Sequence, residues 1–282
     1  SRAEAEARRQ ADTALAVNEF LTRMLGAANP KENPRGREVT VREIVDRAAS
    51  GTTDLQPAVE AGVRHVLATT YLGLGHYEEA AVQASRAEFL GKSALGPRAA
   101  ETLESGLLLA ELDALRGRYA AAESTLAAVS GVLGEADADR SALRARTLHI
   151  RAGVLSEVDR KDEADSVMAE SVALRRTLDP ADPSGLAASL SSLAEIRAAR
   201  GRSEGALPLA QEAREVTVAA FGRDHHDAAM ALGHLGNLYR RLGQHAAAES
   251  VFRESIAIDR KVLGPDHEFL GQSLSNLGIV LA

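Results

Sequence analysis

The stretch Gly75-His76-Tyr77-Glu78-Glu79-Ala80 decides the fold, because related stretches follow it at one fixed interval. The interval is 42 residues, as from Gly75 to Gly117, and the later copies occupy residues 117–122, 159–164, 201–206 and 243–248. An Ala closes every copy. Such a recurrence indicates an array of structural units in which each unit packs against its neighbours.

A second column of small residues precedes the closing Ala by twelve positions. Its members are Ala68, Ala110, Ala152, Ala194 and Gly236. Each unit is therefore predicted to contain two antiparallel helices that turn at the Gly-containing stretch, since Gly readily adopts the positive φ that ends a helix. Small side chains on both helices let the helix axes approach to about 8–10 Å.

Polar residues between the units predict where the next helices begin. Asp182, Asp224 and Asp266 are placed to accept hydrogen bonds from the unpaired N–H groups of a first turn. Pro183 fits the first helical position, where its missing N–H costs nothing.

Residues 1–57 lack the repeat and are predicted to form a helical extension, whereas residues 58–282 are predicted to hold five full repeats and the first helix of a sixth. The extension starts with a candidate long helix over residues 1–27, followed by a loop. Thr40, with Glu43 three positions later, predicts a capping box at the start of a short helix.

The composition excludes several classes of protein. Hydrophobic residues make up 45% of the chain and aromatic residues only 3%, which favours closely packed helices over a sandwich or barrel. A net charge of −7 argues against a nucleic-acid-binding surface, and the absence of Cys excludes disulfides and Cys-ligated zinc. No apolar run approaches the roughly 18 residues of a membrane span, so we expect no direct membrane insertion of this segment. Because the start has no signal-peptide pattern and the end falls within a helical pattern, we expect a fragment of a longer chain.

The small-residue columns resemble those of the tetratricopeptide repeat, whose third small column is filled here by Ala87, Ser171, Ala213 and Ser255. That repeat is usually about 34 residues long, and the longer unit is similar to the repeats of kinesin light chains. The linker Leu263-Gly264-Pro265-Asp266-His267 carries the same likeness. The resemblance implies an all-α, right-handed superhelical solenoid of antiparallel helix pairs, in which the first helices line a concave groove.

A second resemblance lies in the extension. Asn18-Glu19-Phe20-Leu21, Asn29-Pro30 and Val39-Thr40-Val41-Arg42-Glu43, followed by repeats, are similar to a class of bacterial receptor-like serine/threonine kinases. The resemblance implies a sensory or recruitment region beyond a membrane span, outside the cytoplasm. Without that parentage we expect a cytoplasmic protein. The chain itself has no Gly-rich loop, His-Arg-Asp or Asp-Phe-Gly motif.

The chain contains no pattern that predicts catalysis. The densest cluster of candidate metal ligands is Asp224, His225, His226 and Asp227, but adjacent helical residues do not share a face, so capping and solvation explain them better. No nucleophile turn and no phosphate-binding loop occur. We therefore expect no enzyme activity, no cofactor and no metal in this segment.

Binding of a protein or peptide partner is the preferred function, through residues spaced along the first helices. The candidate groove residues are His65, Thr69, Leu107, Glu111, Arg146, His149, Glu195, Asn237, Arg240, Arg241 and Asn276. Asn can both donate to and accept from an extended peptide backbone. Arg240 and Arg241 predict an acidic residue in the ligand near the C-terminal units. Two alternatives stay open: a structural spacer that self-associates through residues 1–27, and a repeat-containing regulator without a kinase.

Overall fold

The structure is a computed structural model, and it describes residues 11, 15–20, 22, 40–52, 55–134, 140–178, 181–264 and 269–281. These residues form helices and turns and contain no strand. Most of the helix predicted over residues 1–27 lies outside the described residues, as does the predicted cap Asp266.

The turns inside the helix pairs share one geometry. Gly75, Gly117, Gly201 and Gly243 have φ between 71° and 73°, and Asp159 takes the same place with φ 63°. The left-handed residue lets the following N–H reach a carbonyl at the end of the first helix, as in the 2.9 Å bond from His76 N to Tyr71 O. The matching bond from Arg160 N to Leu155 O is 2.8 Å long, so Asp159 reproduces the turn without Gly.

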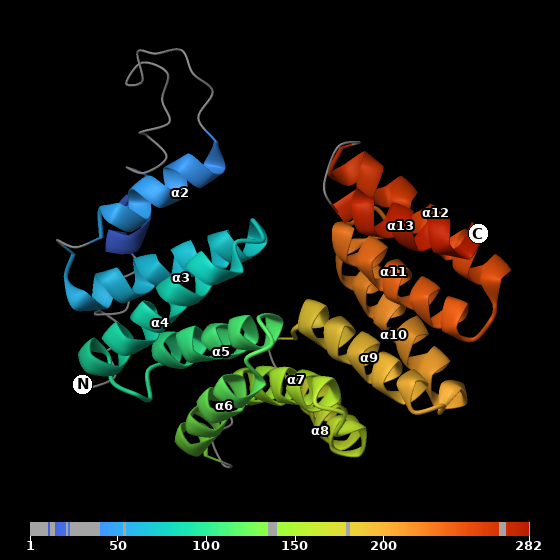
Figure 1. Cartoon of the computed structure of the whole chain (residues 1–282), viewed down its shortest axis with the longest axis horizontal. Helices are drawn as coiled ribbons and strands as arrows, with labels where there is room; N and C mark the ends of the chain where they lie inside the picture. Colours follow the sequence, from blue (N-terminus) through green and yellow to red (C-terminus); the bar gives the residue numbers. More distant parts are fainter. Residues whose placement is uncertain are drawn as a thin grey trace. The chain divides into compact units, whose positions relative to one another are not determined.

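The chain divides into two compact units, residues 1–136 and residues 137–282. Unit 1 contains α2 (Val41–Ser50), α3 (Pro57–Gly73), α4 (Tyr77–Ala94), α5 (Ala100–Leu115) and α6 (Tyr119–Leu133) (Figure 1). Each of these helices packs against the next in the sequence, and α3 also contacts α5. The unit is therefore a stack of antiparallel helix pairs with α2 against its first helix.

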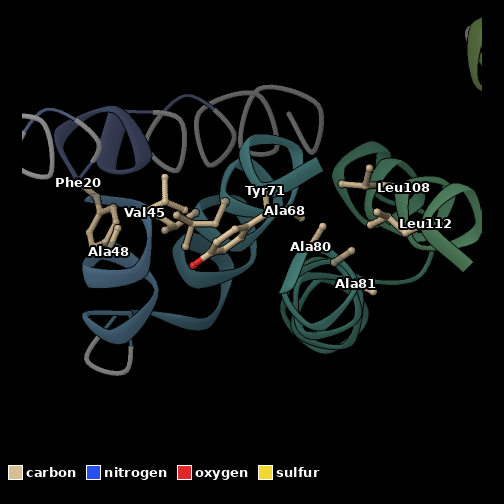
Figure 2. Packing of buried hydrophobic residues seen from close by; sticks show 12 residues of the cluster. Phe20, Val45, Ala48, Ala68, Tyr71, Ala80, Ala81, Leu108 and Leu112 are labelled. Atoms are coloured by element: carbon tan, nitrogen blue, oxygen red, sulfur yellow. The ribbon is translucent and has the colours of Figure 1, made fainter. Parts of the chain in front are cut away.

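The core of unit 1 forms around the two small-residue columns (Figure 2). Ala68 of α3 and Ala80 of α4 are both 0% exposed, which is why these helices can lie close together. Tyr71 joins α2 to the stack, because its hydroxyl donates a 2.6 Å hydrogen bond to Asp46 Oδ1. Burial and the Asp46 carboxylate raise the pKa of Tyr71, so it stays a hydrogen-bond donor.

Two apolar residues of the predicted first helix also belong to this core. Phe20 is 9% exposed within the cluster that contains Val45 and Ala48, and Val17 packs against the cluster from its edge. Both side chains therefore contact the core of unit 1. Leu15, by contrast, is 60% exposed.

Unit 2 repeats the same arrangement. It contains α7 (Ser141–Glu157), α8 (Lys161–Arg175), α9 (Pro183–Ala199), α10 (Ser203–Phe221), α11 (His226–Arg241), α12 (His245–Val262) and α13 (Phe269–Leu281) (Figure 1). Successive helices of the unit pack together, and each first helix contacts the next first helix. Gly236 replaces Ala in its column because a Cβ there would lie only 2.6 Å from the ring of Phe252.

The predicted helix starts are partly confirmed. Thr40 and Glu43 form the capping box, and Asp182 accepts a hydrogen bond from Gly185 N with Pro183 in the first turn. The prediction for Asp224 is wrong: His225 caps α11, its Nδ1 accepting from Asp227 N at 3.2 Å. Asp224 instead forms an ion pair with Lys261, which leaves it outside the first turn.

The all-α fold of stacked antiparallel helix pairs is confirmed. Within the described ranges, no helix has both the length and the apolar character needed to cross a membrane. The division into an extension over residues 1–57 and a repeat array over residues 58–282 stays a prediction.

Candidate functional site

One column of the predicted groove is partly or fully buried. His65, Leu107 and His149 are equivalent positions, 42 residues apart. His65 Nδ1 lies 3.0 Å from Ser105 Oγ and His149 Nδ1 lies 3.0 Å from Ser189 Oγ, so both rings contact the following first helix. Leu107 is 0% exposed. Leu107 therefore offers no exposed side chain to a partner, whereas His65 and His149 are only partly buried.

His149 differs from an ordinary groove histidine in its charge. Burial lowers its pKa to about 4, and the nearby cations Arg175 and Arg146 act in the same direction. Its imidazole is therefore neutral near pH 7 and serves the hydrogen bond with Ser189. It cannot attract an anionic ligand by charge.

The next column along the first helices is open to solvent in part. Thr69, Glu111, Glu195 and Asn237 occupy it; Thr69 is exposed and the other three are partly buried. Glu195 Oε1 lies 2.8 Å from His234 Nδ1, which fixes the position of the carboxylate between α9 and α11. Residues four positions beyond the His65 column thus fit a ligand-facing surface better than the His65 column does.

Four predicted residues meet in one pocket of unit 2. Glu195, Asn237, Arg240 and Arg241 line it together with Leu238, and its volume is about 230 Å³. Sequence reasoning missed Leu238 because it belongs to the apolar face of α11 and is itself 1% exposed. The pocket lies at the last turn of α11, where both arginines stand.

The arginines of this pocket have unused hydrogen-bonding capacity. Arg240 Nε is buried and has no hydrogen-bond partner in the described part of the chain. A buried donor without an acceptor is unfavourable, so an acceptor supplied by a ligand would relieve a cost already present. Arg241 is exposed beside it, and Asn237 adds an amide that can both donate and accept. This set suits a carboxylate attached to a polypeptide backbone.

The remaining predicted residues do not line this pocket. Thr69 and Glu111 belong to unit 1, Arg146 lies near His149, and Asn276 lies on α13. His65 lines a different pocket, in unit 1, of about 260 Å³. Asn276 is 39 residues from Asn237, so the two Asn residues are not equivalent repeat positions.

Comparison with known families identifies the C-terminal repeats. Residues 185–261 and 228–282 match the family model of the tetratricopeptide repeat. Comparison with curated protein sequences gives no match.

Solved structures with this fold extend the likeness over most of the chain. A Rap protein complexed with competence and sporulation factor has a TM-score of 0.70 at 12% identity, covering 95% of this chain and 85% of its own. Kinesin-light-chain TPR-like repeats from Podosopora anserina reach 0.55 at 20% identity, over 73% of this chain and 98% of theirs. BtubC (BKLC) from P. vanneervenii reaches 0.56 at 21% identity, over 72% and 82%. Residues 185–282 therefore match tetratricopeptide repeats, and the chain is similar in fold to kinesin-light-chain TPR-like repeats.

Proposed function

We propose that the chain is a protein-interaction scaffold that binds an acidic segment of a partner in the α9–α11 pocket of unit 2. The observation that carries the proposal is the buried Arg240 Nε, which lacks a partner within the described residues and lines a pocket with Arg241 and Asn237. Arg240 would bond a carboxylate, Asn237 would bond the peptide backbone next to it, and Arg241 would attract the negative charge at the rim.

The charges in the pocket restrict the class of ligand further. Glu195 is already paired with His234, so its carboxylate offers less attraction to a cation than a free Glu would. Two arginines without ion pairs among the described residues leave a net positive site. An Asp or Glu side chain, or a free C-terminus, fits this charge. The Rap protein's complex with competence and sporulation factor supports the proposal only by showing that this fold is compatible with ligand binding.

A display library of random 12-residue peptides tests the proposal. We expect selected peptides to be enriched in Asp or Glu, and Arg240→Glu plus Arg241→Glu to weaken their binding at least 100-fold, about 2.7 kcal/mol. The matched control is Arg223→Glu plus Arg260→Glu, which makes the same charge change at exposed positions of unit 2. Selected peptides with no acidic preference, or equal losses in both double variants, would refute the proposal.

A finer proposal concerns the parent protein. We propose that the scaffold is the sensory or recruitment region of a bacterial signalling kinase, which rests on the resemblance of residues 18–43 to receptor-like serine/threonine kinases. The extension over residues 1–57 and the repeat array over residues 58–282 would then be separate modules of that protein. Reading the coding sequence upstream of Ser1 tests this, and an open reading frame without a kinase domain would exclude it.

The rival function is a spacer that self-associates through residues 1–27. The burial of Phe20 in unit 1, with Val17 partly buried beside it, speaks against it, because Phe20 is not available to a second copy. Sedimentation of the chain with and without residues 1–30 separates the two functions. Only the spacer requires an oligomer that the truncation dissolves.

A further inference from the structure

The pocket of unit 1 lies between α3, the end of α4 and the start of α5. It has a volume of about 260 Å³. Its polar lining comes from His65, Glu101, Glu104 and Ser105, and Gly62 and Gly91 are among the small residues that leave it open. Among these small residues Gly91, near the end of α4, is the one compared with unit 2 below.

The same place in unit 2 is filled by the chain itself. Arg175 follows Gly91 by two repeats, and the 3.0 Å contact between the first helices recurs in both units as His65–Ser105 and His149–Ser189. The second helices end differently, because α8 ends at Arg175 whereas α4 continues to Ala94. The Arg175 side chain is only 7% exposed. Its guanidinium forms an ion pair with Asp182 and lies against the backbone of Gly185.

Unit 1 lacks the guanidinium but carries the charges that would receive one. The positions of Gly185 and Ala188 are occupied in unit 1 by Glu101 and Glu104. The position of Asp182, which pairs with Arg175 in unit 2, is occupied in unit 1 by Arg98. A negative charge for a guanidinium in unit 1 would therefore come from Glu101, at the start of α5. The backbone carbonyl of Glu101 accepts a hydrogen bond from Ser105 Oγ, and its side chain makes no ion pair or hydrogen bond with another described residue.

A buried hydroxyl provides an independent indication of a missing ligand. Thr102 is 2% exposed, and its Oγ1 has no hydrogen-bond partner among the residues that the structure describes. This oxygen lies 2.7 Å from the point where a Cβ on Gly91 would stand, so Thr102 packs against Gly91 beside the pocket, although it is not one of the lining residues. A donor entering beside Gly91 would satisfy it.

We propose that this pocket binds an arginine side chain of a partner protein, in the way that unit 2 binds its own Arg175. A planar guanidinium offers five N–H donors, which suits the two carboxylates of the lining, Glu101 and Glu104. The apolar remainder of the pocket accommodates the methylene chain of the arginine. The site is separate from the α9–α11 pocket and takes a ligand group of opposite charge.

Titration with N-acetyl-arginine methylamide, followed by the amide NMR signals of α5, tests the proposal on the intact chain. We expect shifts confined to the surroundings of Glu101, Thr102 and Ser105, and no comparable shifts with the isosteric but neutral citrulline derivative. Glu101→Gln should weaken the binding about fivefold or more, since it removes a charge-assisted hydrogen bond. The control Glu170→Gln changes an equally exposed carboxylate on α8 and should leave the binding unchanged.

Three outcomes would overturn the proposal. The first is equal binding of the arginine and citrulline derivatives, and the second is equal weakening by Glu101→Gln and Glu170→Gln. The third is equal binding of the lysine derivative, which would exclude recognition of a planar guanidinium. Arg240→Glu plus Arg241→Glu leaves this pocket untouched, so failure here is distinguishable from failure of the acidic-peptide site.

Discussion

Units 1 and 2 contain the same histidine–serine contact but differ in the space beside it. In unit 2 Arg175 fills that space and pairs with Asp182, whereas in unit 1 Gly91 leaves it open. The repeat fixes the backbone and the spacing of the helices in both units. A single residue near the end of the second helix then decides whether the chain fills the pocket or leaves it open to a ligand.

The largest effect on stability is expected when Arg175, which fills the space in unit 2, is removed. Arg175→Ala removes an ion pair whose arginine is 7% exposed, and it leaves a cavity. Because Asp182 is 41% exposed and can be rehydrated, we expect a loss of about 2–3 kcal/mol in the free energy of unfolding, below the range for a fully buried pair. Urea unfolding followed by circular dichroism measures it.

The neighbouring residue supplies the control for this prediction. Arg176 pairs with Glu212, but both side chains are exposed, at 48% and 37%. Arg176→Ala should therefore cost no more than about 0.5 kcal/mol. If the two alanine variants lose the same stability, Arg175 is not a structural filler and the comparison with Gly91 fails.

The next effect is a pH dependence of stability, because Arg175 lies close to the titratable His149. The pKa of His149 is 6.5 in the unfolded chain and about 4 in the folded one, so only the unfolded state takes up a proton between these values. Stability is fully present above pH 6.5 and falls as the pH drops toward 4, by at most about 3 kcal/mol. Urea unfolding at pH 7.0 and pH 4.5 measures the change.

Two variants assign this pH dependence to His149. His149→Gln keeps a group that can hydrogen-bond to Ser189 but cannot titrate in this range, so its loss of stability at pH 4.5 should be smaller than that of the wild type. Arg175→Met keeps most of the volume and removes the positive charge, so the pKa of His149 should rise. An NMR titration in which that pKa stays near 4 would show that Arg175 does not contribute to the lowering.

The repeat geometry could be predicted from the sequence because it depends on backbone requirements that recur. The left-handed turn needs Gly or a tolerated substitute, and Asp159 could be aligned with the glycines by its spacing alone. The close helix contacts need small residues, which the Ala68 and Ala80 columns supply. Both signals repeat every 42 residues and are therefore visible without coordinates.

The sites could be predicted only in part, because they depend on side chains that do not recur. Residues 91, 133, 175, 217 and 259 read Gly, Leu, Arg, Thr and Asp, which gives no periodic pattern. The direction of the Leu107 column depends on how consecutive helix pairs rotate, and the spacing alone does not specify that rotation. The Arg240–Arg241 pair was found because its charge stands out within one helix.

A smaller effect is expected when the arginine of unit 2 is introduced at the equivalent position of unit 1. Gly91→Arg places a guanidinium in the open pocket, where it can pair with Glu101 as Arg175 pairs with Asp182. We expect binding of the arginine derivative to fall at least tenfold. We also expect a loss of about 1–3 kcal/mol in the free energy of unfolding, since the new Cβ must displace Thr102 Oγ1. NMR titration and urea unfolding measure the two effects.

Gly73→Arg is the matched control for that variant. Gly73 lies in α3 and a Cβ there meets no atom within 4 Å, so the same substitution adds an exposed side chain to the helix. It should leave binding of the arginine derivative unchanged. An equal loss of binding in both variants would mean that added positive charge, and not occupation of the pocket, prevents binding.

The smallest expected effect lies at the turn where unit 2 departs from the glycine pattern. Asp159 holds φ 63°, a conformation that costs a residue with a Cβ more than it costs Gly. The ion pair of Asp159 with Lys161 is too exposed, at 83% and 40%, to offset this. Asp159→Gly should therefore raise Tm by about 1–3 °C, and the mirror change Gly201→Asp should lower it by a similar amount. If both variants lower Tm, the side chain of Asp159 stabilises its turn, and the turns at Asp159 and Gly201 are equivalent in shape but not in the interactions that stabilise them.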